Sequence, residues 1–362
     1  MKFEFLDTIN TDLWMYLAQT DKKIVMYGTG NGADKIIDVL DDKGIKLSGI
    51  FASDDFARDR FFRGFKVKKY SDFCEEFDDF IVIVSFATQR NEVLENIYRI
   101  ASERELYAPD VPVFGDGLFD LSYFNDNREK LLKVYNKLSD DFSRETFIST
   151  IAFKLTGKIT FLKDCESNNE SETALLKSKI KNTNYVDIGA YTGDTIEKYC
   201  DTFGKKEKII AFEPDKKNFS KMLDRFEEKQ IECRCLNCAA WDKDELLKFY
   251  SNSGRAGSAD KNRSNEKYIE VMGVKGDDYI NTSVGFIKID AEGSDAKVLR
   301  GLTETIRKNK PFIKVAAYHR NEDYFNIPET IDAICPDYKL YMRHLKYIPG
   351  WDTDFFFEFV TD

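Results

Sequence analysis

Residues 185–195, Tyr-Val-Asp-Ile-Gly-Ala-Tyr-Thr-Gly-Asp-Thr, constrain the fold of this chain more than any other stretch. We interpret Val186–Ile188 as the end of a buried strand. Gly189 and Gly193 then enclose a tight turn, and a helix is predicted to begin near Thr195. A strand, a glycine turn and a helix in this order open a nucleoside-binding α/β sheet, because glycine lets the backbone approach a ligand closely.

An acidic residue lies at the spacing expected for a ribose ligand. The strand predicted at 208–213 ends in Glu213, and a carboxylate roughly 20 residues beyond the glycine turn accepts hydrogen bonds from ribose hydroxyls. The turn lacks the Gly-x-Gly-x-x-Gly pattern of phosphate-binding loops, and Asp187 and Asp194 would repel a pyrophosphate. These features favour S-adenosylmethionine (SAM), which carries ribose, adenine and a sulfonium cation, over NAD.

A further apolar block, residues 285–293, ends in Asp290, Glu292 and a glycine. In an open parallel sheet, ligands lie beyond the carboxyl ends of the strands. We therefore expect these two carboxylates to face the same space as Asp187 and Glu213. The sequence predicts one acidic, ligand-binding edge of a sheet.

At these blocks the chain resembles the FkbM family of SAM-dependent methyltransferases, from about Val134 to the C-terminus. Four motifs occur in the family's order: Val-Asp-Ile-Gly-Ala-Tyr-Thr-Gly-Asp-Thr (186–195), Phe-Glu-Pro-Asp (212–215), Asn-Cys-Ala-Ala-Trp (237–241) and Ile-Lys-Ile-Asp-Ala-Glu-Gly (287–293). The resemblance implies an α/β fold with a class I methyltransferase Rossmann-like sheet. It implies these cofactor-binding residues: Asp187, Gly189, Ala190, Tyr191, Gly193, Asp194, Thr195, Glu213, Pro214, Asn237, Ala239 and Asp290.

Two histidines near the C-terminus extend the resemblance, His319 before Arg-Asn-Glu-Asp and His344 at the end of Tyr-x-Leu-Tyr-x-Arg-His. Methyl transfer from a sulfonium uses an electrophile that is already activated, so the protein has to place the acceptor and remove its proton. We predict His319 as the catalytic base, with Asp290 and Glu292 as alternatives. No dedicated metal site is predicted, although Mg²⁺ could bind these carboxylates with His319 or Asp187. His344 lies in a strand pattern and is predicted to be structural.

The acceptor is expected from the resemblance to be a hydroxyl of a sugar or glycoconjugate, as in bacterial polysaccharide biosynthesis. The chain departs from the family pattern in two places. Ser294-Asp295 stands where the family usually has Ala-Glu, which keeps the charge. The family's closing Glu-Thr segment is matched only loosely by residues 351–354, so the acceptor could differ from the family's.

Residues 1–115 alternate strand and helix patterns, which predicts a smaller Rossmann-like α/β domain. Gly28, Gly30 and Ala33 match the dinucleotide fingerprint, with Asp54 as a possible ribose ligand. Two interpretations stay open: a nucleotide or nucleotide-sugar site, or a scaffold whose glycine turn is only a turn. The first would make the chain an NAD(P)-linked oxidoreductase or a nucleotide-sugar-binding protein, but no Tyr-x-x-x-Lys pair is evident near this domain.

The rest of the chain is predicted to form a helical connector, residues 116–170, and the methyltransferase domain, residues 171–362. In the connector, apolar residues recur at helical spacing, and Lys154–Leu162 is predicted to be a loop or short strand. Near the C-terminus, residues 338–343 and 354–360 are predicted to form the antiparallel pair that closes such a sheet.

Composition narrows the possible partners. The length of 362 residues suggests two domains. The formal charge of −10 disfavours nucleic acids and anionic membranes. Neither a signal-like N-terminus nor an apolar run of about 20 residues is present, so we expect a cytoplasmic protein without a membrane span. Cys233, Cys235 and Cys238 lack paired zinc-ligand spacing and are predicted to be buried thiols. The sequence does not specify an oligomeric state.

Overall fold

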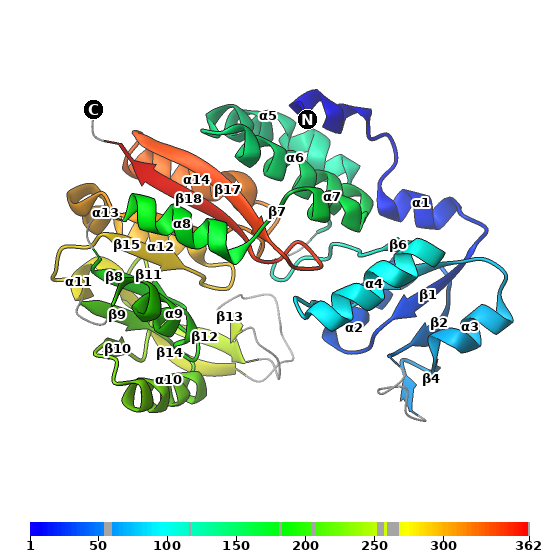
Figure 1. Cartoon of the computed structure of the whole chain (residues 1–362), viewed down its shortest axis with the longest axis horizontal. Helices are drawn as coiled ribbons and strands as arrows, with labels where there is room; N and C mark the ends of the chain where they lie inside the picture. The colour runs from blue at the N-terminus through cyan, green and yellow to red at the C-terminus, as the bar shows by residue number, and fades with distance from the viewer. Residues whose placement is uncertain are drawn as a thin grey trace.

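The computed structural model describes residues 1–53, 60–115, 117–180, 183–204, 208–251, 257–258 and 268–360. Asp54, predicted as a ribose ligand, lies outside these ranges. Figure 1 shows two sheets at opposite ends of the molecule's long axis, with a group of helices above and between them.

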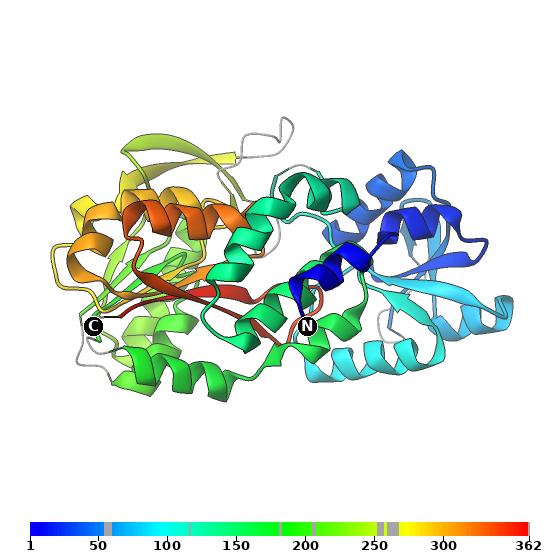
Figure 2. The same cartoon turned by 90° about the horizontal axis from the view of Figure 1, so that it is seen from above.

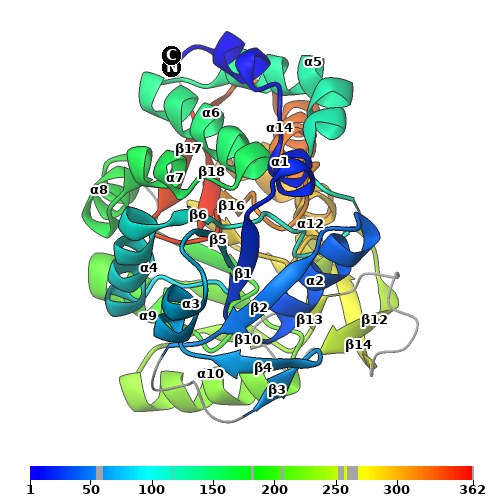
Figure 3. The same ribbon diagram turned by 90° about the vertical axis from the view of Figure 1, so that its right-hand side faces the viewer.

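The first sheet contains six strands among the described residues, in the order β3-β4-β2-β1-β5-β6. Neighbouring strands run parallel except β3 and β4. The strands are β1 (Lys23–Tyr27), β2 (Leu47–Phe51), β3 (Phe61–Phe62), β4 (Phe65–Lys68), β5 (Phe80–Val84) and β6 (Glu105–Tyr107). Figure 3 shows helices on both faces of this sheet, namely α2 (Asn31–Asp42), α3 (Tyr70–Glu76) and α4 (Asn91–Glu103).

The residue pattern explains this arrangement. β5 reads Phe-Ile-Val-Ile-Val and is buried along its whole length, as expected for a strand covered on both faces. α2 buries Ala33, Ile36, Ile37 and Leu40, which recur at helical spacing on one side of the helix. The smaller Rossmann-like sheet predicted from the sequence is confirmed, while the predicted domain boundaries stay predictions.

The second sheet has the strand order β10-β9-β8-β15-β16-β18-β17-β7 in the described part of the chain. Its strands are β7 (Glu166–Ser167), β8 (Tyr185–Ile188), β9 (Ile209–Phe212), β10 (Arg234–Leu236), β15 (Phe286–Ile289), β16 (Phe312–Ala316), β17 (Tyr338–Leu345) and β18 (Thr353–Phe359). Of these strands, β18 runs antiparallel to its neighbours, so the predicted closing pair is confirmed. The strand order reverses between β8 and β15, and such a switch point opens a crevice at the carboxyl ends of the strands.

Helices cover the second sheet, and a small sheet extends from it. The helices are α8 (Asn169–Lys179), α9 (Asp194–Phe203), α10 (Lys216–Lys229), α11 (Gly276–Tyr279), α12 (Asp295–Gly301), α13 (Thr303–Asn309) and α14 (Asp323–Ile334). The small sheet has the order β11-β14-β12-β13, with β11 (Ala239–Trp241), β12 (Glu245–Ser251), β13 (Gly257–Ser258) and β14 (Tyr268–Lys275).

Three helices that follow the first sheet in the chain lie between the two sheets when the molecule is seen from above (Figure 2). They are α5 (Leu121–Lys137), α6 (Asp141–Thr156) and α7 (Ile159–Asp164). η1 (Phe3–Thr8) and α1 (Leu13–Gln19) precede the first sheet, and α1 packs Leu13, Trp14 and Leu17 into its core. α6 is buried on nearly every side, because Phe147 and Ile151 belong to the core of the second sheet and Phe153 to that of the first. The described helices include none that combines the length and apolar character needed to cross a membrane.

The prediction of a loop or short strand at Lys154–Leu162 is wrong. α6 continues to Thr156, and α7 begins at Ile159. Gly157 ends the first helix in a left-handed conformation with φ of 66°, and its N–H donates to the carbonyl of Phe153. The glycine therefore separates two helices, and the apolar residues after it pack on one face of the second.

Candidate active site

The glycine turn after β8 is shaped by close packing at the carboxyl edge of the second sheet. Gly189 has a φ of 74°, and a Cβ atom there would lie 1.9 Å from the carbonyl oxygen of Asp290. Gly193 has a φ of 78°, and its Cβ would lie 2.5 Å from the ring of Phe226. The Gly193 N–H donates to the carbonyl of Ala190 over 2.8 Å and closes the turn. Both positions therefore require glycine, and α9 begins directly after them.

Asp187 lies beneath this turn and has no exposed surface. Its carboxylate accepts a short hydrogen bond from the hydroxyl of Thr195, at the start of α9. Burial raises the pKa of Asp187, and Lys288 and Thr195 oppose this shift only in part. Asp187 thus connects the strand to the helix that follows the turn, rather than projecting freely toward a ligand.

Lys288 is a site residue that the sequence analysis missed. It lies opposite Asp187 in the register of β15 and β8, and its Nζ is 3.4 Å from the Asp187 Oδ1 and 3.7 Å from the Asp290 Oδ2. The amine also donates to the carbonyl of Gly189 over 3.0 Å. Burial opposes the charge on Lys288, but the two carboxylates outweigh it and raise the pKa of the amine. A lysine inside the apolar Ile-Lys-Ile run was the available signal.

Glu213 directly follows β9 and is 5% exposed. Its two carboxylate oxygens accept hydrogen bonds from the backbone N–H groups of Tyr191 and Asp215, each over 2.8 Å. Burial raises the pKa of Glu213 to about 7, although these two N–H donors favour the ionised form. Each oxygen retains a lone pair that a ribose hydroxyl could use.

The other predicted cofactor residues lie on the turn or on the neighbouring strand ends. Asn237 donates from Nδ2 to the carbonyls of Glu213 over 2.9 Å and Pro214 over 3.2 Å, which fixes the segment after β9. Ala190 is buried, Tyr191 is 38% exposed, and Asp194 is exposed at the start of α9. Ala239 begins β11 of the small sheet.

Beyond β15 and β16, three carboxyl groups surround the imidazole of His319. The His319 Nε2 lies 3.2 Å from the Asp290 Oδ1 and 3.4 Å from the Glu292 Oε2. The Nδ1 lies 3.1 Å from the Asp295 Oδ2. His319 itself is 1% exposed, so both ring nitrogens are occupied by carboxylates rather than by solvent.

Asp295 was not predicted as a site residue. It is fully buried at the start of α12, where its carboxylate accepts the N–H groups of Ala291 over 2.9 Å and Gly293 over 3.2 Å. These bonds hold a turn in which Glu292 has a φ of 50°. Asp295 therefore fixes both the imidazole of His319 and the backbone that carries Glu292. The available signal was the acidic residue that follows Glu292-Gly293 and Ser294 in the sequence.

Three of the ionisable side chains at this cluster have pKa values that are shifted in different directions. Burial lowers the pKa of His319, but Asp295 and Asp290 outweigh it, so the net pKa is well above the ordinary value. Burial opposes ionisation of Asp290, yet Lys288 and His319 hold its pKa below the ordinary range. Burial raises the pKa of Glu292 to about 8, with His319 opposing and Asp290 adding to the shift. Near neutral pH the arrangement is an imidazolium, an ionised Asp290 and a mostly protonated Glu292.

The cluster also offers ligand atoms that a cation could use. One oxygen each from Asp290 and Glu292 and a nitrogen of His319 lie within 4.8 Å of one another. A second group with the same spacing comprises Asp295, His319 and Asp323. Lys288 and the imidazole of His319 also contact these carboxylates, so a cation would compete with them for the same oxygen atoms.

A second buried ion pair lies farther along the sheet. Lys314 of β16 is next to Lys288 in the strand register, and its amine contacts Glu172 of α8 and, over 3.1 Å, the Asp354 Oδ2 of β18. Burial favours neutral Glu172, but Lys314 outweighs it and lowers the pKa of the carboxyl group. This pair attaches α8 to the strands next to the site.

His344 lies apart from the cluster, on β17. It is 1% exposed, and its Nδ1 is 2.9 Å from the hydroxyl of Thr353 on β18. Burial lowers the pKa of His344 to about 3, so the ring is neutral. This position agrees with the structural role expected for it.

The segment that follows the first sheet lies against the His319 cluster. The Phe114 N–H donates to the carbonyl of His319 over 3.1 Å. Arg320 donates from Nε to the carbonyl of Gly293 over 2.7 Å, and Asn321 donates to the carbonyl of Gly117 over 3.3 Å. Phe114 and Gly117 therefore lie against the segment that carries His319.

The glycine turn of the first sheet has a different environment. A Cβ at Gly28, where φ is 112°, would lie 2.4 Å from the ring of Phe86. Gly30 has a φ of 118° and no neighbouring atom within 4 Å of its Cβ position, and Ala33 is fully buried. Packing and backbone conformation account for these residues, and nucleotide binding at them stays a prediction. The candidate ribose ligand Asp54 lies outside the described residues.

Comparisons with known proteins give a match to one family model and a similarity to a solved structure. Residues 187–349 match the family model described as a methyltransferase FkbM domain. No curated protein sequence gives a significant match. Among solved structures, a methyltransferase FkbM from Methylobacillus flagellatus KT aligns with a TM-score of 0.72 and 18% identity, covering 95% of this chain and 92% of that chain. That similarity shows a shared fold across both sheets.

Two further solved structures align with about half of this chain. Aeropyrum pernix fibrillarin in complex with SAM aligns with a TM-score of 0.34 and 12% identity, over 52% of this chain and 74% of that chain. SMU.1697c, a putative methyltransferase from Streptococcus mutans in complex with SAH, aligns with a TM-score of 0.36 and 8% identity, over 54% and 99%. Both similarities are too slight to carry an argument.

Proposed function

We propose that this chain, whose residues 187–349 form an FkbM methyltransferase domain, transfers the methyl group of SAM to a hydroxyl of a sugar or glycoconjugate. The class, a SAM-dependent methyltransferase, follows from the family match. The oxygen acceptor is our inference. One observation carries it: Asp290 and Glu292 lie beside the glycine turn with pKa values shifted in opposite directions.

SAM would lie across the turn from Gly189 to Gly193. Its ribose hydroxyls would donate to Glu213, whose oxygens are already held in place by two backbone N–H groups. Its sulfonium would lie near the ionised Asp290, which favours a cation. The close approach of the turn to the Asp290 carbonyl supports this placement, because a bulkier residue at Gly189 would separate the two strands.

Glu292 is the group best suited to accept the proton of the acceptor. Its pKa of about 8 is close to working pH, where a general base is most effective. The acceptor oxygen attacks the methyl carbon, the carbon–sulfur bond breaks, and sulfur keeps the electron pair as S-adenosylhomocysteine (SAH). The proton of the hydroxyl passes to the carboxylate of Glu292, so charge and atoms balance.

His319 was predicted as the base, but its environment supports a positioning role. Both ring nitrogens contact carboxylates, and the raised pKa keeps the imidazole protonated. A protonated ring cannot accept a second proton. It instead lowers the pKa of Glu292, which would otherwise be too weakly acidic to ionise near neutral pH.

The proposed acceptor also suggests the pathway and the cell compartment in which the enzyme acts. A sugar acceptor would place the enzyme in polysaccharide or glycoconjugate biosynthesis, and we expect it to act in the cytoplasm. The net charge of −10 is unfavourable for nucleic acid as the acceptor. Mg²⁺ is not needed in the proposed step.

The test combines cofactor binding with an acceptor screen. Calorimetry should detect SAM and SAH binding to the full chain, and NAD should not bind at the same site. Radiolabelled SAM and a panel of sugars and oligosaccharides should then give a methylated ether. If SAM binds and the label appears on nitrogen or carbon acceptors instead, the O-methyltransferase proposal is wrong.

A further inference from the structure

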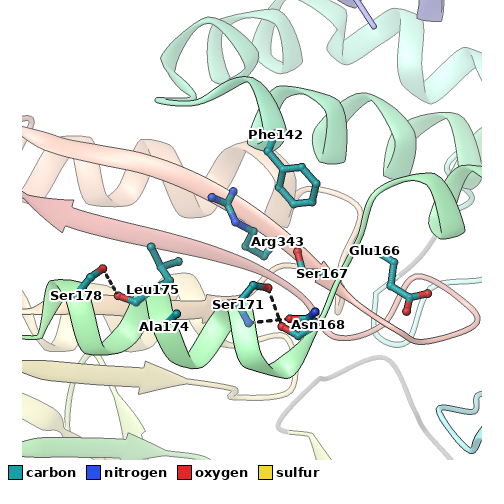
Figure 4. Close-up of a pocket in the computed structure, with 9 residues that line it drawn as sticks. All are labelled: Phe142, Glu166, Ser167, Asn168, Ser171, Ala174, Leu175, Ser178 and Arg343. Carbon is teal, nitrogen blue, oxygen red and sulfur yellow. Dashed lines mark hydrogen bonds between the residues drawn. The ribbon is translucent and has the colours of Figure 1, made fainter.

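A groove on the outer side of α8 lies apart from the cofactor turn. It has a volume of about 550 Å³, within the range of roughly 300–1,000 Å³ that is usual for small-molecule sites. Figure 4 shows α8 on one side of it, with Phe142 of α6 and Arg343 of β17 on the other. Its lining residues are Phe142, Glu166, Ser167, Asn168, Ser171, Ala174, Leu175, Ser178 and Arg343.

Ser167 lines this groove and carries a buried hydroxyl. Its side chain is 6% exposed, and its hydroxyl has no hydrogen-bond partner. A buried hydroxyl without a partner costs about 1–3 kcal/mol, so a ligand that accepts a hydrogen bond from it would recover that cost. β7, which carries Ser167, pairs with the end of β17, so the hydroxyl is held on a strand rather than on a loose loop.

The hydroxyls along α8 face the groove mainly as acceptors. Ser171 and Ser178 each donate to a backbone carbonyl of their own helix over 2.8 Å, which leaves their oxygen lone pairs available. Glu166 adds further acceptor oxygens at one end. A ligand rich in O–H donors would suit this wall.

The opposite wall offers an aromatic face and no spare positive charge. Phe142 is 39% exposed, and the guanidinium carbon of Arg343 lies 5.1 Å from its ring centre. Arg343 donates to both carboxylate oxygens of Asp140, over 3.4 and 2.7 Å, and to Ser143 over 2.7 Å. Because Asp140 neutralises this arginine and Glu166 is acidic, a phosphorylated ligand would be disfavoured.

We propose that this groove binds a neutral saccharide unit of the acceptor, away from the hydroxyl that is methylated. This inference rests on the proposed sugar acceptor. α8 connects the two places, because Glu172 on its other side contacts Lys314 next to the catalytic edge. Hydroxyls of the saccharide would donate to Ser171, Ser178 and Glu166, its apolar face would pack on Phe142, and one oxygen would accept from Ser167.

The test uses the full chain saturated with SAH and a matched pair of tryptophan variants. Ala174→Trp would fill the groove from the exposed side of α8, whereas Lys177→Trp adds the same bulk to the same helix outside the groove. Binding of short neutral oligosaccharides of glucose, galactose and rhamnose, and of their phosphorylated counterparts, would be followed by saturation-transfer NMR. SAH affinity and thermal unfolding of each variant would show that the fold is intact.

The proposal expects wild type to bind at least one neutral oligosaccharide. Ala174→Trp should weaken that binding about tenfold or more, equivalent to about 1.4 kcal/mol, while Lys177→Trp stays within about twofold. Ser167→Ala should weaken it by roughly twofold to tenfold, the contribution of one neutral hydrogen bond. No binding by any neutral oligosaccharide, binding that survives Ala174→Trp, or a preference for the phosphorylated forms would overturn the groove assignment. The proposed function fails separately if sugars bind here but no sugar hydroxyl is methylated.

Discussion

The two parallel sheets of this protein each place a glycine turn after a buried strand, but the surroundings of the two turns differ. Near Gly28 the close neighbours are the ring of Phe86 and the hydroxyl of Ser85. Near Gly189 they are the Asp290 carbonyl and the amine of Lys288. A glycine pattern therefore identifies a tight turn in both sheets. The second turn differs from the first in the buried charged groups that lie beneath and beyond it.

The carboxyl groups of the two regions show the same contrast. In the described part of residues 1–115, the carboxyl groups whose pKa departs from its ordinary value are all lowered, because hydrogen-bond donors outweigh burial: Asp79, Glu92, Glu103, Glu105 and Asp7. At the edge of the second sheet, burial raises the pKa of Glu213 and Glu292, while Lys288 and His319 outweigh burial and lower that of Asp290. Raised values of this kind are common at active sites, where burial serves chemistry rather than stability.

The largest expected effect is a loss in the free energy of unfolding, and it tests how tightly each of the two glycine turns is packed. Gly189→Ala would place a Cβ 1.9 Å from the Asp290 carbonyl in a left-handed conformation, so we expect a loss of about 4 kcal/mol or more in the free energy of unfolding. Gly30→Ala meets no atom within 4 Å and pays only for its backbone conformation, about 1–3 kcal/mol. Urea unfolding of both variants would measure the difference. Equal losses would mean that the second turn is no more tightly built than the first.

The next largest effect is on kcat, when the proposed general base Glu292 is replaced. Glu292→Gln should lower kcat about 100-fold or more, since it removes the proton acceptor, while SAM affinity stays nearly unchanged. The wild-type rate should rise with pH through about 8, the pKa of Glu292. The measurement is kcat with the acceptor sugar that the screen identifies. A variant with full turnover and an unchanged pH profile would exclude Glu292 as the base.

His319→Gln serves as the positioning control for that experiment. Without an imidazolium 3.4 Å from the Glu292 Oε2, the carboxyl group should ionise at higher pH. The midpoint of the pH–rate profile should move upward, and raising the pH should restore part of the lost rate. If His319 were itself the base, its removal would abolish the pH-dependent rise instead of shifting it.

A smaller effect is expected on SAM affinity when Glu213 is replaced, and Ser53 of the first sheet provides the comparison. Glu213→Ala removes acceptors for two ribose hydroxyls, each worth roughly 1.5–3 kcal/mol, so SAM affinity should fall at least about tenfold. Ser53 lies at the equivalent strand end of the first sheet, where its hydroxyl is 3.0 Å from that of Tyr27. Ser53→Ala should leave SAM affinity unchanged in calorimetry. Unaltered SAM binding in a folded Glu213→Ala variant would remove the ribose assignment.

The sequence predicted the sheets, the glycine turns and the acidic strand ends, because each depends on local pattern: apolar runs, glycine spacing and the residue that follows a strand. Lys288 and Asp295 were missed, since their importance depends on register and on a helix start that brings them to Asp187 and His319. The prediction of His319 as the catalytic base assumed the ordinary pKa of a histidine. Three carboxyl groups within residues 290–295, more than 20 positions before His319, surround the ring and raise that pKa.

The last comparison concerns how the stability changes with pH, and the expected change has opposite signs in the two regions. Asp323 is 3% exposed, and burial together with nearby Asp295 raises its pKa to about 8. A carboxyl group with a raised folded-state pKa contributes stability that is complete below its unfolded value of 3.8 and is lost as pH rises toward 8. Asp323→Asn imitates the protonated form and keeps an acceptor for the Arg320 N–H. The decline in unfolding free energy between these pH values should become shallower by about 1 kcal/mol per pH unit. Glu105 in the first region provides the control. Its pKa is lowered, because hydrogen bonds from Tyr107, Tyr16 and Lys22 outweigh burial. Glu105→Gln should reduce only the loss of stability that occurs below the unfolded pKa of 4.5, as the pH falls through the folded pKa. Urea titrations across pH would compare the variants, and an unchanged slope in Asp323→Asn would mean that Asp323 is ionised in the folded protein.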